Sequence, residues 1–197
     1  VLLGVLALAG VATPLAFGRG VIGAQFDPVL FFMGAGFLLI ETRGVTSLSL
    51  LFGSTWMVNS AIFGGILFMV LMANLAVERF ELKRATPWAF ALATALLLLW
   101  WVDPAALNSL SLVQRGTVGA LVTGLPIGCA GVIVSILLCR SANPTAALGS
   151  NLLGSVLGGC LEYMSMIVGL QALVLLAIAI YLLALYAAQR TQVPESS

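Results

Sequence analysis

Three charged side chains lie well inside long apolar stretches of the sequence: Glu41 and Arg43 in one stretch and Glu162 in another. A charge at the centre of a membrane helix costs at least about 2.5 kcal/mol on insertion scales, so such residues face a bundle interior or a wet cavity. Glu41 and Arg43 are two residues apart and point to roughly opposite sides of a helix, which makes them poor partners. We therefore predict an ion pair between Arg43 and Glu162, with Arg115 as the competing cation for Glu162.

This pairing leaves Glu41 without a cation, and two interpretations stay open. Glu41 is either an inert neutral carboxyl bonded to a neighbour such as Asn59 or Asn151, or an acid of the kind that a proton-coupled carrier uses. For Glu162 the alternatives are a satisfied acid in a helix seam and a carboxylate that titrates or binds a cation. The candidate intramembrane polar site consists of Glu41, Arg43, Asn59, Asn151 and Glu162.

The stretch 148–166 that contains Glu162 reads LGSNLLGSVLGGCLEYMSM. In a helix, Ser150, Gly154 and Gly158 form a ridge of small residues spaced four apart. Small residues at this spacing let a second helix approach closely and replace lipid contact with packing. We predict that these three residues contact another helix.

The composition indicates an integral membrane protein. Of 197 residues, 61% are hydrophobic and 8% are charged, whereas a soluble domain carries about 25% charge. We predict an all-α, polytopic transmembrane helix bundle with one domain at 1–188 and a short cytoplasmic tail at 189–197. The seven expected spans are 1–17, 29–53, 56–77, 88–102, 118–139, 146–168 and 172–188.

Capping residues before proline mark the expected helix starts. The cap side chain accepts a hydrogen bond from a backbone N–H of the first turn. Proline at the first helical position costs no helical hydrogen bond, because the N–H that it lacks would have no partner there. The four dipeptides are Asp27-Pro28, Thr86-Pro87, Asp103-Pro104 and Asn143-Pro144. Span 29–53 exceeds a bilayer of about 30 Å, so it must tilt or break, and Gly44 is a plausible break.

Basic residues set the expected orientation. Six of them fall on one side of the membrane if the spans alternate: Arg19, Arg79, Lys83, Arg84, Arg140 and Arg190. The opposite loops hold only Arg115. The positive-inside rule therefore predicts a cytoplasmic C-terminus.

No cofactor, metal site or nucleic-acid partner is expected. The chain has no histidine, and its three cysteines lack metal-type spacing. A net charge of +1 implies no nucleic-acid partner. The expected partners are the lipid bilayer and either other membrane subunits or a missing N-terminal part, since the sequence starts without methionine.

Three motifs carry a family resemblance: GAGFLLIETR, LFGSTWMVNS and LGSNLLGSVLGGCLEY. With their flanks, at 31–76 and 148–185, they resemble the membrane region of bacterial spermidine-synthase-like proteins, some of which are labelled as fused to a major-facilitator-type membrane part. The resemblance implies the bacterial inner membrane. The family's aminopropyltransferase-like soluble domain has no counterpart here, because the longest polar loop has about ten residues, so we expect no enzyme.

Two functions remain in view. The intramembrane charges and small-residue seams favour a transporter-like membrane module of unknown substrate. The absence of catalytic motifs and the short loops favour a structural or accessory subunit of a larger membrane complex. An intramembrane enzyme is disfavoured because HExxH, GxSxG and paired membrane aspartates are lacking.

Overall fold

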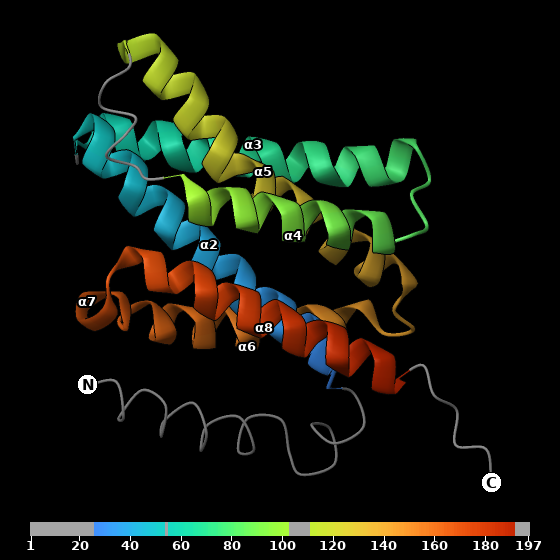
Figure 1. The fold of residues 1–197 in the computed structure, drawn as a ribbon. Helices are drawn as coiled ribbons and strands as arrows, with labels where there is room; N and C mark the ends of the chain where they lie inside the picture. Colours follow the sequence, from blue (N-terminus) through green and yellow to red (C-terminus); the bar gives the residue numbers. More distant parts are fainter. Residues whose placement is uncertain (1–25, 54, 103–110, 192–197) are drawn as a thin grey trace, which may run out of the picture.

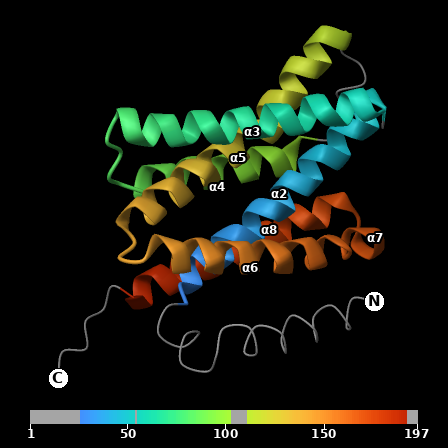
Figure 2. The same cartoon turned by 180° about the vertical axis from the view of Figure 1, so that it is seen from behind.

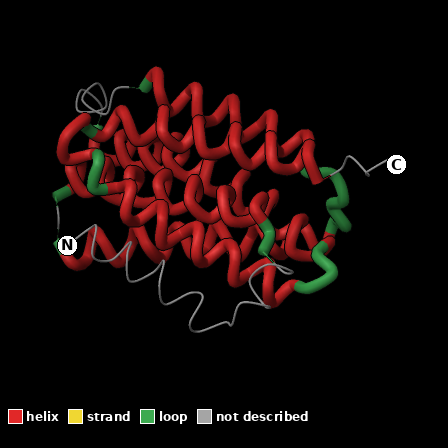
Figure 3. The backbone as a smooth tube through the Cα atoms, turned by 90° about the horizontal axis from the view of Figure 1, so that it is seen from below, coloured by secondary structure: helices red, strands yellow, loops and turns green. Residues whose placement is uncertain are grey.

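The chain forms an all-α bundle in the computed structural model, which describes residues 26–53, 55–102 and 111–191. The helices are α2 (Pro28–Phe52), α3 (Trp56–Arg79), α4 (Thr86–Trp101), α5 (Leu112–Arg140), α6 (Pro144–Glu162), α7 (Ser165–Val168) and α8 (Leu170–Thr191). The connecting segments gather at the two ends of the bundle (Figure 3). The expected tail at 189–197 begins inside α8, which continues to Thr191.

Five stretches of the described chain are long and apolar enough to cross a bilayer, so the prediction of seven spans was too high. These stretches are Pro28–Phe52, Trp56–Arg79, Gly116–Arg140, Pro144–Val168 and Leu170–Arg190. Helix α4 has only 16 residues, about 24 Å at 1.5 Å per residue, which is shorter than the bilayer core of about 30 Å. The expected first span, 1–17, lies outside the described residues. The chain is nevertheless a multi-pass membrane protein.

Two of the four predicted helix caps are confirmed. The Asp27 carboxylate accepts from two backbone N–H groups of the first turn of α2, at 2.9 and 3.1 Å, and Asn143 accepts from one in α6 at 3.2 Å. The prediction for Thr86 was wrong, because the helix starts one residue earlier and Ala85 is its N-cap. Asp103 lies outside the described residues.

Helix α2 occupies the centre of the bundle. Figures 1 and 2 show it running diagonally between α6 and α8 on one side and α3, α4 and α5 on the other. Leu30, Ala35 and Leu39 of α2 have no exposed surface. The predicted break at Gly44 is wrong: α2 is continuous from Pro28 to Phe52, and Gly44 packs against α5, where an added Cβ would lie 3.6 Å from Cβ of Thr123.

Helices α2 and α6 run in the same direction, as the alternation of spans predicts. The Asn151 side-chain amide donates to the Leu30 carbonyl at 3.1 Å. One turn later, the Ser155 hydroxyl donates to the Gly34 carbonyl at 3.3 Å. Both partners advance by four residues between these bonds, so the two helices are parallel.

The backbones of α2 and α6 are in direct contact. A Cβ added at Gly154 would overlap the carbonyl oxygen of Phe31. A Cβ added at Gly158 would overlap the carbonyl oxygen of Ala35 and lie 3.1 Å from its Cα. Ser150 lies on the same ridge and is 3% exposed. The small residues of this ridge therefore lie against α2.

Helix α6 ends at Glu162, before the end of the expected span 146–168. Tyr163 and Met164 separate it from the single turn of α7. Gly169 then has φ +84°, a left-handed conformation that glycine adopts without steric cost and that allows the chain to turn into α8. Glu162 consequently lies at the end of α6, within the candidate membrane-spanning stretch Pro144–Val168.

We expect Gly154→Ala to destabilise the bundle, by roughly 1–3 kcal/mol as for an overpacked core, because the opposing atom is a backbone carbonyl that cannot rotate away. Gly149→Ala is the matched control, since the same helix has nothing within 4 Å of an added Cβ there and alanine favours helix over glycine. Thermal unfolding in lipid nanodiscs measures both. Equal unfolding temperatures for the two variants would contradict the contact.

Candidate functional site

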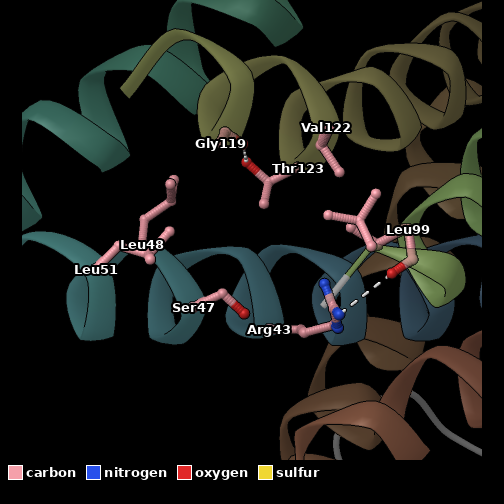
Figure 4. A pocket seen from close by; sticks show the side chains of 9 residues that line it. Arg43, Ser47, Leu48, Leu51, Leu99, Gly119, Val122 and Thr123 are labelled. Carbon is pink, nitrogen blue, oxygen red and sulfur yellow. Dashed lines mark hydrogen bonds between the residues drawn. The ribbon is translucent and has the colours of Figure 1, made fainter. Parts of the chain in front are cut away.

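Arg43 is the one charged side chain buried in the described interior, with 2% of its surface exposed. It lies about 14 Å from the end of α2, at 1.5 Å per residue, and therefore within the membrane-spanning length. One guanidinium nitrogen, Nη2, donates to the Leu99 carbonyl of α4 at 3.4 Å (Figure 4). This carbonyl belongs to the last turn of α4, where backbone acceptors have no partner within the helix. Arg43 therefore ties α2 to the end of α4.

Arg43 borders a small cavity between α2, α4 and α5, with a volume of about 20 Å³. Three of the lining residues are polar: Arg43, Ser47 and Thr123. The other lining residues are apolar and come from all three helices. The accessible surface of the cavity is apolar, although these three polar side chains border it.

Two polar atoms at the cavity have no hydrogen-bond partner: Nε of Arg43 and the hydroxyl of Ser47. Ser47 is 3% exposed and lies one turn after Arg43, a spacing that places both side chains on the same face of α2 (Figure 4). The Thr123 hydroxyl is satisfied, because it donates to the Gly119 carbonyl at 2.7 Å. An unpaired buried polar group is costly, so Nε of Arg43 and the Ser47 hydroxyl each destabilise the packed interior.

The predicted ion pair between Arg43 and Glu162 is wrong. The one ion pair among the described side chains joins the exposed Lys83 and Glu81 at 3.5 Å. Helix α6 packs on the Phe31 face of α2, and twelve residues at about 100° each turn Arg43 roughly 120° away from that face. Glu162 is only partly buried.

The other predicted site residues bond elsewhere. Asn59 accepts from the Ser49 hydroxyl at 2.9 Å, and Asn151 donates to an α2 carbonyl. Neither amide bonds to Glu41, a half-buried residue whose carboxyl group has no hydrogen bond within the described part of the chain. The five predicted polar residues therefore do not form one cluster, and the side chain of Arg115 lies outside what is described. Ser47 was missed, although its position four residues after Arg43 was a usable signal.

A metal centre has no support within the ranges 26–53, 55–102 and 111–191, where no group of three or more cysteine, aspartate or glutamate side chains could hold an ion. No protein-family model matches the sequence, and neither a curated protein nor a solved structure matches it. The geometry around Arg43 is therefore the feature from which a function can be inferred.

A double-mutant cycle of Arg43→Met and Glu162→Gln should be additive within about 0.5 kcal/mol, as expected for side chains without a shared contact. The positive control is Ser49→Ala with Asn59→Leu, whose hydrogen bond should produce a measurable coupling. Equilibrium unfolding of the purified protein in mild detergent gives both values. Coupling above 1 kcal/mol between Arg43 and Glu162 would restore the ion pair.

Proposed function

We propose that this chain is a transporter-like, multi-pass membrane module in which Arg43 contributes to an intramembrane binding site for a charged solute. One observation carries the proposal: a buried guanidinium with an unpaired Nε, and with no ion-pair partner among the described residues, lies beside a small cavity inside a spanning helix bundle. Ionisable residues within membrane spans are rare and commonly mark ion or substrate pathways. An apolar residue of similar volume would pack there at lower free-energy cost. The proposal assigns no catalytic activity to the chain.

The orientation of the chain in the membrane and the identity of that membrane are part of the same proposal. The end of the bundle that carries the basic loop after α3 is assigned to the cytoplasm by the positive-inside rule. The motif resemblance described above supports the bacterial inner membrane and a kinship with the membrane region of spermidine-synthase-like proteins.

The loop after α3 is expected to be cytoplasmic. In a variant whose only cysteine is placed at Lys83, a side chain with 78% exposure, an impermeant thiol reagent should label the protein only after right-side-out cells are opened. The native Cys129, Cys139 and Cys160 are replaced by serine or alanine beforehand. Rapid labelling of sealed cells would reverse the orientation.

Charge movement tests the transport proposal. The intact chain is reconstituted into proteoliposomes on a solid-supported membrane, and inorganic anions, cations and protons are exchanged in turn. We expect a transient current with at least one of these ions, and at least a tenfold smaller current for Arg43→Met. Arg79→Met, at the exposed end of α3, should keep the current. Folded protein that gives no current with any of them would overturn the proposal.

A structural or accessory role is the second candidate, and the exposed surface of α3 favours it. Only Ala73 and Val77 of this helix are buried. Gly64 and Gly65 have open space around them, and exposed small residues suit the close approach of another membrane helix. An Arg43→Met chain that still assembles into a larger membrane complex, together with an absence of current, would favour this role.

A further inference from the structure

We infer that the groove between the ends of α3 and α5 binds a zwitterionic phospholipid whose headgroup carries a primary ammonium, with Glu78 and Arg140 as the two charged contacts. The groove shares no lining residue with the cavity beside Arg43. The inference goes beyond the transport proposal and does not depend on it.

The groove lies where two membrane-spanning stretches end. The stretches Trp56–Arg79 and Gly116–Arg140 finish at the same end of the bundle (Figure 2). The last turns of α3 and α5 line the groove together with the loop after α3. Two lining residues, Val77 and Ile136, precede the ends of these stretches by two and four residues, which is about 3–6 Å at 1.5 Å per residue. A lipid in the groove therefore has its headgroup at the span ends and its first acyl carbons beside these apolar residues.

A Schellman motif at the end of α3 shapes one wall of the groove. The Leu82 N–H donates to the Val77 carbonyl at 3.1 Å, and the Glu81 N–H donates to the Glu78 carbonyl at 3.4 Å. Glu81 has φ +45°, at the position where this motif usually has glycine. The turn packs Leu82 against the buried cluster that contains Val77 and Ile136. The apolar wall of the groove is therefore held in place by both helices and the loop.

The charges at the groove include one acid and one base on different helices. Two carboxylates and two basic side chains line it, so its charges sum to zero. Lys83 and Glu81 pair with each other at 3.5 Å. Glu78 near the end of α3 and Arg140 at the end of α5 are both exposed, and they form no ion pair with each other. The groove thus presents a carboxylate from one helix and a guanidinium from the other.

A phosphoethanolamine headgroup complements these two charges. Its phosphate can accept from the Arg140 guanidinium, whose planar set of donors matches phosphate oxygens. Its ammonium can donate to the Glu78 carboxylate. A choline headgroup has the same charges but no N–H to donate, and a glycerol headgroup offers no cation to Glu78. Basic pockets between membrane helices bind lipid headgroups by the same kind of contact.

The size and surface of the groove favour a lipid over a soluble zwitterion. Its volume is about 640 Å³, within the range of about 300–1,000 Å³ that is typical of ligand sites. Most of its accessible surface is apolar, and a smaller part is polar. Acyl chains would remove this apolar surface from water, whereas free phosphoethanolamine has no apolar part that could do so.

Native mass spectrometry of the intact protein tests the inference. The chain in mild detergent is titrated with dioleoyl phosphatidylethanolamine, phosphatidylcholine or phosphatidylglycerol, one lipid at a time. We expect the ethanolamine lipid to bind about threefold to tenfold more tightly than either of the others, as one charge-assisted hydrogen bond provides. Water-soluble phosphoethanolamine should not displace it. Equal affinities for the three lipids, or displacement by the soluble headgroup, would overturn the inference.

Three variants make the test specific to the groove. Glu78→Gln should remove the preference for the ethanolamine lipid over the choline lipid and keep the binding of the choline lipid. Arg140→Gln should weaken the binding of all three lipids about tenfold. Arg79→Gln is the matched control and should keep both affinity and preference, because Arg79 is exposed in the last turn of α3 and does not line the groove.

The unfolding temperature of each variant without added lipid checks that it is folded. If Arg140→Gln does not fold, Glu78→Gln decides the matter. A folded Glu78→Gln chain that keeps the full preference for the ethanolamine lipid would overturn the site, and so would an equal loss of affinity in Arg79→Gln and Arg140→Gln.

Discussion

The arrangement of the whole bundle depends on the backbone contact between α2 and α6. Gly154 and Gly158 leave no room for a Cβ against the carbonyls of Phe31 and Ala35. Between membrane helices there is no hydrophobic driving force, so close packing and interhelical hydrogen bonds provide the association. The polar side chains of α6 add hydrogen bonds to carbonyls of α2. This contact fixes the rotation of α2 about its own axis as well as its direction.

The rotation of α2 determines where its charges lie. With the Phe31 face held against α6, the face that carries Arg43 and Ser47 is turned toward α4 and α5. The shortness of α4 matters here, because its last turn ends at the depth of Arg43 and the Leu99 carbonyl in that turn accepts from the guanidinium. A longer α4 would have continued past Arg43 with its carbonyls satisfied within the helix. The positions of Arg43 and Ser47 thus result from the contact with α6 on one side of α2 and from the end of α4 on the other.

The sequence could predict features that depend on one helix at a time. The Asp27 and Asn143 caps follow from local hydrogen bonding, and the parallel run of α2 and α6 follows from the alternation of spans. Features that depend on the mutual rotation of helices could not be predicted. Arg43 and Glu162 were paired because both charges lie in apolar spans without a counter-ion nearby in the sequence, and this does not reveal which face of α2 meets α6. The predicted number of spans was too high because a short apolar segment was counted as a span. Helix α4 is apolar but has only 16 residues.

The contact with Leu99 does not by itself explain an arginine at this position. A serine or asparagine can donate to a helix-end carbonyl without bringing a full charge into the membrane. Arginine carries five N–H donors, and the bond to Leu99 is long at 3.4 Å. One of the remaining donors, Nε, has no hydrogen-bond partner, and neither has the Ser47 hydroxyl one turn later in α2. The same side chain is the one that bonds the end of α4, so Arg43 links the central helix α2 to α4 inside the bundle.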